Sequence, residues 1–443
     1  MEHRVRATYG ARHREVTGRG AGKSAGNIYV VNLRGDAMKS GDEFRLEGDK
    51  IFGAGSRNGV QITLLVRNPV RDLSIPARLH YAEVPERSSL AAKFTWLREL
   101  GDVTSEAFDE VPVDESHDWI NQTDGSFGTL LPVCRLAKQS TGEEMFSTHA
   151  LGVATNCDVY VYSFSRESLT DRVRRLIDAY EEARELYELG EPLETVTRND
   201  FLSEIPMSDT PLQQDLPIGG ATGDDRDNVT DWCLEQFHER YGPAVTKDDI
   251  WEYVHGVMHA PDWRDRYRHD LQRNLPRIPL ADDFEAFWAA GRVLMDLHIG
   301  YETVPEWPLA CLVDGEPDEG AGDPAAYRID GRMRWGGKRG AEDRSVLLIN
   351  ERCRLVGIPD EAHHYTVSGR SPLEWAIDSL RLKVDRDSGI TDDPNGWCAW
   401  ADDPFELIRH LRRLVHVSVV TARTIAALPP SLPPEDDQEP RPD

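Results

Sequence analysis

Residues 250–302 read IWEYVHGVMHAPDWRDRYRHDLQRNLPRIPLADDFEAFWAAGRVLMDLHIGYE and are the most informative stretch of the chain. Apolar and aromatic residues recur at helical spacing from Ile250 to Met258, and again from Phe284 to Leu297. Between these patterns, Arg277-Ile278-Pro279-Leu280 must be extended, because a residue that precedes proline is pushed out of the helical region. The pattern alone predicts a helical core element in which two helices are joined by a proline-bearing hinge.

The N-terminal half alternates between strand and helix patterns. Asn27–Leu33 and Val60–Val66 are β-branched apolar runs bounded by glycine-rich segments, so we expect neighbouring strands of one sheet. The period becomes helical at Leu90–Leu100 and at Leu169–Tyr187, where charged residues mark the outer face. Residues 1–26 are rich in arginine and glycine without periodicity, and we expect them to form a loosely ordered lead-in.

The C-terminal half is expected to begin after a linker at residues 191–228, which are rich in proline, glycine and acids. A mostly helical segment should run from Asp231 to Leu297, with short β-like runs at 327–335, 345–350 and 352–358. Ser371-Pro372-Leu373-Glu374 has the pattern of a capped helix start. Residues 405–428 form a last amphipathic pattern, and the acidic, proline-rich tail 429–443 is expected to be disordered. These patterns predict an α/β (mixed α+β) fold.

The composition is strongly acidic and poor in lysine. The 443 residues include 78 acidic and 51 basic ones, giving a formal net charge of −27, and only eight of the basic residues are lysines. Phosphate binding needs a positive field, so this balance argues against a protein coated in nucleic acid, although a local basic patch could still touch DNA. An acidic, lysine-poor surface favours a halophilic source, because salt limits the self-repulsion to short range.

The six cysteines are scattered without a C-x-x-C pair, so the sequence suggests neither a zinc site nor a disulfide framework. The N-terminus has no apolar segment of the kind found in signal peptides, and no run approaches eighteen apolar residues. We therefore expect a reduced, cytoplasmic protein without contact to a membrane.

Four blocks of the chain carry a resemblance to a known protein family. They are Asn27–Pro69 (with NIYVVNLRGDAMKSG), His117–Tyr187 (with HDWINQ), Ile250–Glu302, and Ile358–Pro394 (with HHYTVSGRSPLEWAIDSLRL). In this order they resemble the C-terminal half of type ISP restriction-modification enzymes, which fuse a nuclease, a translocating ATPase, an N6-adenine methyltransferase and a target-recognition domain in one chain. The resemblance implies a partial methyltransferase-like sheet over residues 27–190, then a helical connector and a mixed α/β target-recognition domain over residues 229–428. It also implies double-stranded DNA as the partner.

The sequence departs from the family at its catalytic centre. The tetrapeptide N-P-P-[YF], which holds the flipped adenine in such enzymes, does not occur, and the nearest string is Asn68-Pro69-Val70. Phe52-Gly53-Ala54-Gly55 is similar to the S-adenosylmethionine loop, but the resemblance places it between two late strands, so we interpret it as a glycine-rich turn. We therefore expect a truncated derivative without catalytic residues, which binds no S-adenosylmethionine unless a separate chain supplies the missing loop.

Three further patterns fall short of a site. Residues 18–24 imitate a phosphate-binding loop, but Thr17 stands where its first glycine belongs. His255 and His259 have a spacing that can bind metal, but no third ligand lies nearby in the sequence, and His363-His364 is interpreted as a surface pair. Residues 385–393 resemble a calcium loop whose glycine is misplaced and whose closing glutamate is missing. No metal site is predicted.

The one dense cationic stretch of the chain has an aromatic residue inside it and is our candidate for DNA contacts. Arginine forks read guanine edges and pair with phosphates, so such a cluster between strands suits a DNA groove. The candidates are Arg328, Arg332, Arg334, Trp335, Lys338, Arg339 and Arg344, followed in second rank by Tyr365, Ser368 and Arg370. The alternative is a basic loop that balances a nearby acidic face.

Three hypotheses about function follow. The first is the DNA target-recognition portion of a type ISP system, which would not be catalytic alone. The second is a subunit that completes an N6-adenine methyltransferase together with a separate chain. The third is a decayed fragment without affinity for DNA, which the net charge would suit.

Overall fold

The computed structural model describes residues 4–9, 26–38, 44, 46–52, 58–66, 77–112, 123–134, 142–148, 162–188, 227–338, 340–386 and 389–433. The chain divides into two compact units. The first unit comprises Met1–Leu130, Pro261–Arg277 and Thr366–Arg370, and the second comprises Leu131–Ala260, Ile278–Tyr365 and Ser371–Asp443. Residues 191–226 of the predicted linker (191–228) and residues 434–443 of the predicted tail (429–443) lie outside the described residues.

The first unit contains a five-stranded sheet. Its order is β1 (Arg4–Tyr9), β3 (Val60–Val66), β2 (Asn27–Asn32), β4 (Arg78–Glu83) and β5 (Asp109–Val111). The β2–β4 pair is parallel and the other pairs are antiparallel. The predicted pairing of the strands at 27–33 and 60–66 is confirmed. The expectation of a loosely ordered lead-in is wrong for β1, because its backbone finds hydrogen-bond partners along β3.

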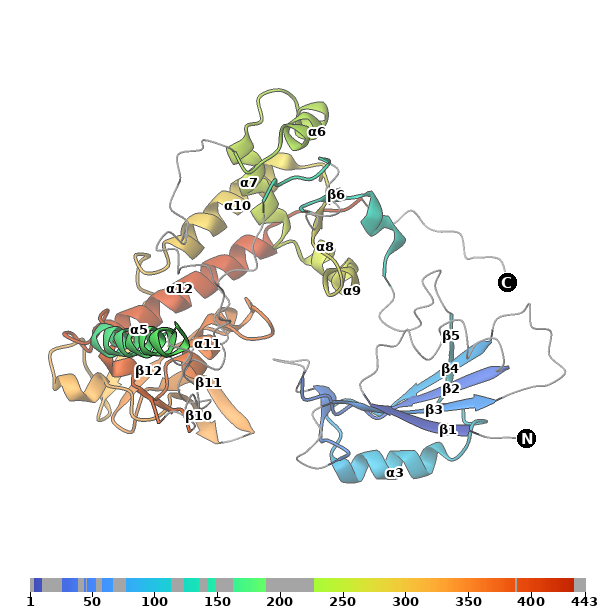
Figure 1. Cartoon of the computed structure of the whole chain (residues 1–443), viewed down its shortest axis with the longest axis horizontal. Coiled ribbons are helices and arrows are strands. Elements are labelled where there is room, and N and C mark those ends of the chain that lie inside the picture. The colour runs from blue at the N-terminus through green and yellow to red at the C-terminus, as the bar shows by residue number, and fades with distance from the viewer. Residues whose placement is uncertain are drawn as a thin grey trace. The chain divides into compact units, whose positions relative to one another are not determined.

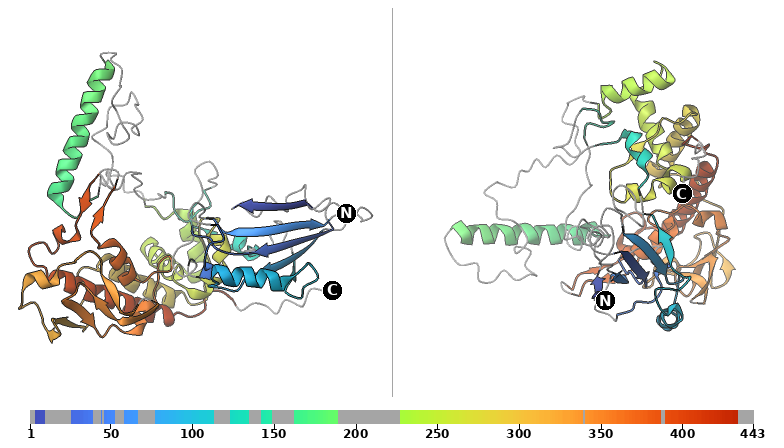
Figure 2. Two further views of the ribbon diagram at one scale, coloured as in Figure 1. Left: turned by 90° about the horizontal axis from the view of Figure 1, so that it is seen from below. Right: turned by 90° about the vertical axis from the view of Figure 1, so that its right-hand side faces the viewer.

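Helix α3 (Leu90–Leu100) lies alongside this sheet, as the views in Figures 1 and 2 show. The side chain of Ser89 caps the helix by accepting a hydrogen bond from the Ala92 amide. Lys93 is fully buried, and its ammonium group donates to the carbonyl oxygens of Leu33 (2.8 Å) and Glu47 (2.9 Å). Burial lowers the pKa of Lys93, and these two hydrogen bonds satisfy a polar group that would otherwise be costly inside the protein.

Residues 261–277 of the first unit contain the short helices α8 (Pro261–Arg266) and α9 (Arg268–Leu271). Arg266 forms an ion pair with Asp124, with 2.8 Å between nitrogen and oxygen. Asp124 in turn caps the 3-10 helix η1 (Gly125–Thr129). The Trp263 indole donates to the carbonyl of Arg277, which begins the two-residue strand β7 (Arg277–Ile278). The predicted extended hinge is therefore confirmed, and its first residue is anchored by a buried tryptophan.

The second unit is mixed α and β. Its helices are α5 (Arg166–Glu188), α6 (Asp231–Tyr241), α7 (Lys247–Val257), α10 (Phe284–Ile299), α11 (Pro372–Ser379) and α12 (Glu406–Ala426). These helices match the predicted segments, and the predicted capping box of Ser371 and Glu374 is present at the start of α11. The two-residue strand β6 (Leu131–Pro132) precedes them. Every helix among the described residues is too short or too polar to span a bilayer.

Helices α7 and α10 cross at very close range. A Cβ atom on Gly256 would lie 2.1 Å from the carbonyl oxygen of Phe287, and one on Gly291 would lie 1.8 Å from that of Glu252. Tyr253 is fully buried beside the crossing, where its hydroxyl donates to the Pro279 carbonyl and accepts from the Ala281 amide. Two glycines thus allow the close spacing of the helices, and Tyr253 holds the hinge residues Pro279 and Ala281 beside the crossing through its hydroxyl group.

A second five-stranded sheet, antiparallel throughout, completes this unit. Its order is β10 (Arg334–Lys338), β11 (Ala341–Leu348), β12 (Cys353–Val356), β8 (Ala310–Val313) and β9 (Glu316–Pro317). Its inner face packs with α11 and α12 into one apolar cluster. The run predicted as β-like at 327–335 is mostly not a strand, because the 3-10 helix η3 (Pro324–Tyr327) ends at its first residue and β10 begins only at Arg334. A separate two-stranded turn, β13 (Lys383–Val384) with β14 (Thr391–Asp392), occupies the stretch that resembles a calcium loop.

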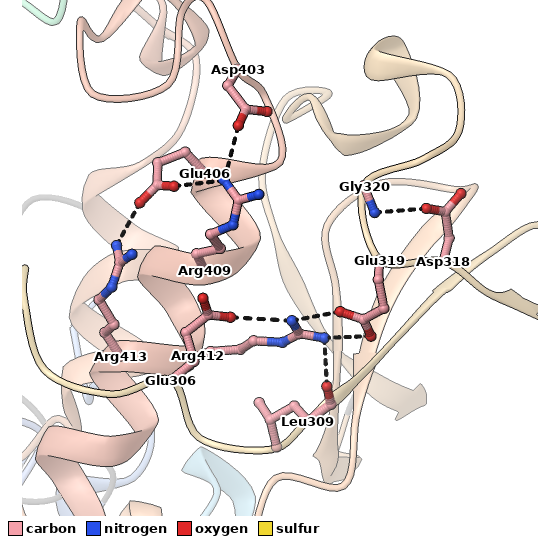
Figure 3. Close-up of polar contacts among 10 residues, drawn as sticks. All are labelled: Glu306, Leu309, Asp318, Glu319, Gly320, Asp403, Glu406, Arg409, Arg412 and Arg413. Carbon is pink, nitrogen blue, oxygen red and sulfur yellow. Dashed lines mark hydrogen bonds and ion pairs between the residues drawn. The ribbon is translucent and has the colours of Figure 1, made fainter.

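Arg412 ties α12 to this sheet (Figure 3). Its side chain is only 8% exposed, yet its guanidinium group pairs with Glu306 (3.2 Å) and Glu319 (2.8 Å). The same group donates to the carbonyl of Leu309, directly before β8 (2.7 Å). The start of strand β8 is therefore held by a charge-assisted hydrogen bond from α12.

We predict that Gly291→Ala destabilises the protein by about 1–3 kcal/mol or more, since the methyl group overpacks the crossing. Without the crossing, alanine would stabilise a helix interior by roughly 0.5–1 kcal/mol relative to glycine. The sign of the change in the free energy of unfolding, measured by urea denaturation, therefore tells whether the helices cross as closely as the structure shows. Ala289→Gly, at an exposed position of the same helix, measures the propensity effect alone. A stabilised Gly291→Ala variant would contradict the close crossing.

We further predict that Glu306→Gln/Glu319→Gln costs about 3 kcal/mol of stability, because it leaves a buried arginine charge uncompensated. Arg412→Met should cost less, since it removes the buried charge itself and both glutamates are partly exposed to water. Glu316→Gln, which removes one carboxylate charge at an exposed position outside these ion pairs, is the control. Thermal and urea unfolding that rank Arg412→Met as the worse variant would refute this account.

Candidate nucleic-acid interface

The dense cationic stretch forms a β-hairpin made of β10 and β11, residues Arg334–Leu348, which we call the cationic hairpin. Its strands pair up to Lys338 and Ala341, so the turn between them is tight. Gly337 has a φ of +77°, and a Cβ atom there would lie 2.6 Å from the Ala341 carbonyl oxygen. Glycine is therefore required at this position, and the G-G-K-R-G sequence builds the turn that presents the basic side chains.

The hairpin register breaks between Trp335 and Gly336. Trp335 pairs with Leu347 but Gly336 pairs with Asp343, so residues 344–346 of β11 have no counterpart on β10. Such a bulge bends a strand and re-aims its side chains. Arg344 lies in this bulge, where its guanidinium group is 5.6 Å from the Trp335 ring centroid and pairs with Glu374 of α11 at 2.7 Å.

His363 contacts both strands at the bulge. Its Nε2 atom donates to the Arg344 carbonyl (3.1 Å), and its ring lies edge-on to Trp335 at 5.2 Å between centroids. Burial, together with the neighbouring Arg344 charge, lowers the pKa of His363. The interpretation of His363-His364 as a surface pair is therefore wrong for His363, whereas His364 is exposed.

The alternation of side chains sorts this sheet into two faces. Trp335, Leu347, Leu355 and Cys311 stand opposite one another across four strands and belong to the apolar cluster or pack against it. The next row across the same strands contains Arg334, Leu348, Arg354 and Leu312, which by the period of two lie on the other face. Arg334 and Arg354 are exposed, so the outward face carries two arginines in one row.

The predicted cations divide into paired and unpaired ones. Arg332 forms an ion pair with Asp378 at 3.4 Å, and Arg344 pairs with Glu374, so both face carboxylates of α11. The other described candidates are exposed and form no ion pair with any residue that the structure describes: Arg328, Arg334 and Lys338. The unpaired cations are the ones available to phosphates or bases. Arg339 lies outside the described residues.

Arg354 was not among the predicted residues. It is exposed and forms no ion pair with a described residue, in the same way as Arg334. The signal was present in the sequence, because the strand Cys353-Arg354-Leu355-Val356 alternates between apolar and charged positions and so directs Arg354 outward. Arg354 was missed as a candidate because it lies outside the cationic stretch in the sequence.

The predicted residues do not all converge on one place. Arg328 follows η3, and its carbonyl accepts from Asn350, just beyond the last residue of β11, whereas Lys338 pairs with the first. Tyr365 is half-buried and stacks on His298 at 5.5 Å between ring centroids. Ser368 and Arg370 belong to the first unit, where the backbones of Val367 and Arg370 pair. The cationic hairpin therefore contains only part of the predicted set.

The charge of the hairpin differs from that of the chain. Residues 334–348 contain four basic and two acidic residues, while the whole chain carries a net charge of −27. One of the two acids, Asp343, accepts hydrogen bonds from Ser345 within the hairpin, and these bonds lower its pKa. A locally positive surface on an acidic protein can approach nucleic acid when salt screens the distant charges.

The cofactor-like motifs cannot be placed. Gly53–Gly55 of the glycine-rich turn, the imitation of a phosphate loop at 18–24 and the string at 68–70 lie outside the described residues. For metals, the structure adds what the sequence lacked: His298 of α10 comes close to His255 and His259. Their ligand nitrogens lie within 4.8 Å of one another.

Comparison with known proteins gives a family match that begins in the first half of the chain and extends through most of the second. Residues 144–215 and 207–410 match the model of the type ISP C-terminal specificity domain. Among curated proteins no sequence matches significantly.

Solved structures with the same fold cover almost the whole chain. A nuclease-deletion mutant of the type ISP restriction-modification enzyme LlaGI, in complex with a DNA substrate mimic, is 24% identical over 93% of this chain with a TM-score of 0.68. The ATP-dependent type ISP enzyme LlaBIII, bound to DNA, is 23% identical over 93% (TM-score 0.70). A DrdV–DNA complex is 24% identical over 91% (TM-score 0.71). This chain spans only 37%, 31% and 48% of those three chains, respectively.

Proposed function

The chain belongs to the type ISP C-terminal specificity domain family, and we propose that it recognises a specific sequence in double-stranded DNA. This target recognition would direct the adenine methylation and cleavage of a restriction-modification system. The observation that supports the proposal most is the family match over residues 144–410 together with an exposed cationic hairpin inside that region.

The shape of the hairpin suits a DNA groove. A two-stranded β-ribbon fits the major groove of B-DNA, where arginine can bond to guanine through both arms of its fork. Arg334 and Arg354 share one outward row of the sheet, so both could face the same stretch of duplex. We assign base reading to this row and phosphate contact to Lys338, at the end of the hairpin.

The domain boundaries form part of the same proposal. We place a partial methyltransferase-like region at 27–190, a linker at 191–228 and the specificity domain at 229–428, flanked by segments 1–26 and 429–443. The surplus of acidic residues and the scarcity of lysine support a cytoplasm of high salt as the working environment.

We predict that Arg334→Ala weakens binding to the selected site by about 1–3 kcal/mol and relaxes the sequence preference at one position. Lys338→Ala should weaken binding to all sequences alike and reduce the slope of log affinity against log salt by about 1. The measurement is selection from a pool of random duplexes at several salt concentrations, followed by titration of the enriched site.

Arg352→Ala is the matched control, since it removes the same charge from an arginine that already pairs with Asp314 and Asp323. It should leave both affinity and preference almost unchanged. If the wild-type chain retains no duplex even at low salt, the decayed fragment is the better account. Equal losses in Arg334→Ala and Arg352→Ala would place the contacts outside the hairpin.

The five-stranded sheet of the first unit favours a second function, completion of an N6-adenine methyltransferase with a separate chain. That chain would supply the S-adenosylmethionine loop and N-P-P-[YF], neither of which this sequence contains in the required place. We predict no transfer of labelled methyl groups to adenine by this chain alone, and transfer by the mixture. Activity of the mixture should fall with Arg334→Ala. A mixture that binds the site but stays inactive would refute this second function.

A further inference from the structure

The histidine cluster of the second unit suggests a function that DNA recognition does not use. His255 lies on α7, His259 two residues after its end, and His298 on α10. The ring centroid of His255 lies 4.8 Å from that of His259 and 5.8 Å from that of His298. We propose that these three imidazoles bind one zinc ion that joins α7 to α10.

His255 is the group that most needs a ligand. Its Nε2 atom is buried and has no hydrogen-bond partner among the described residues. A buried polar atom without a partner costs free energy, and a metal ion would supply the missing interaction. Burial and the neighbouring imidazoles lower the pKa of His255 to about 4, so the ring is neutral at pH 7 and its lone pair is available.

The other two histidines have the supporting contacts of metal ligands. His259 Nδ1 donates to the His255 carbonyl (2.8 Å), so the neutral ring carries its lone pair on Nε2. His298 Nε2 bonds to the Thr421 hydroxyl of α12 (3.0 Å), so we assign Nδ1 to the metal, and Tyr365 stacks on the same ring. Such partners orient a ligating imidazole and fix its tautomer. Burial likewise lowers the pKa of His298 to about 4.

The donor set points to zinc. Three imidazoles without a carboxylate suit zinc and its late transition-metal neighbours, whereas magnesium and calcium require oxygen ligands. Ligands of a tetrahedral zinc ion lie roughly 3.3 Å apart, as follows from Zn–N bonds of about 2.0–2.1 Å. In this structure one ring nitrogen from each histidine lies within 4.8 Å of one from each of the other two. Rotation of the side chains would then close the site around an ion. The fourth position would hold water.

The ion also has a route to the site. His255 lines a pocket of about 570 Å³ together with Trp251, Val254 and Met258 of the same helical segment. The other residues that line this pocket belong to the same unit: Val133, Cys134, Phe146, Thr148 and Asn228. Of the three histidines, His255 is the one that lines this pocket.

The test is the zinc content of the full chain. After treatment with a chelator and dialysis, the wild type should take up one zinc per chain in competition with a chelating dye. The same chain loaded with cobalt should show the visible d–d bands of a four-coordinate site. A wild-type chain that binds no zinc in this competition overturns the proposal, whatever the variants do.

Variants locate the ion. His255→Ala and His259→Gln should each lower the zinc affinity at least about 100-fold, because the loss of an outer-shell partner alone costs roughly 10–100-fold. His364→Ala, an exposed histidine outside the cluster, should bind zinc as the wild type does. Circular dichroism is the check that the variants are folded. His255→Ala is the milder change, because it removes no hydrogen bond of the His255 ring. Retention of wild-type affinity by His255→Ala would refute the site.

Discussion

The close crossing of α7 and α10 is the constraint on which the second unit depends. At Gly256 and Gly291 the backbones come so near that one added methyl group would meet a carbonyl oxygen. Packed interiors tolerate little adjustment, so the residues beside the crossing inherit its geometry. His255 adjoins Gly256, and His298 lies two turns along α10 from Gly291, so the crossing also brings their rings together. Helix spacing and histidine cluster thus have one cause.

Helix α12 carries this geometry to the sheet. Thr421 bonds to His298 of α10 near one end of the helix, and Arg412 holds the backbone before β8 two to three turns earlier. The amphipathic helix α12 therefore links the sheet that presents the cationic hairpin to α10, and its apolar side belongs to the core that it shares with this sheet. Because the anchoring arginine is buried, its charge stabilises only while both glutamates compensate it.

Local patterns in the sequence were sufficient to predict most elements of the second unit. Helical spacing identified α7, α10 and α12, and the Ser371 capping box identified the start of α11, because these signals lie within a few residues. Strands β1 and β8 were missed, since their partners β3 and β12 are remote in sequence, and β9 has only two residues. Distance in the sequence also explains why two site residues were missed. Strand pairing places Arg354 in the same row as Arg334, and helix packing places His298 beside His255 and His259.

The arginine-rich composition of this acidic protein suits the proposed reading of DNA. Salt reduces the gain from releasing counterions, so phosphate contacts lose most of their value in a concentrated cytoplasm. Bidentate hydrogen bonds from arginine to base edges depend on geometry, and lysine cannot form them with the same fixed fork. A chain with eight lysines among 51 basic residues has therefore kept the cation whose contacts survive screening. On the cationic hairpin, the outward row of Arg334 and Arg354 is where such short-range contacts can form while distant acidic charges are screened.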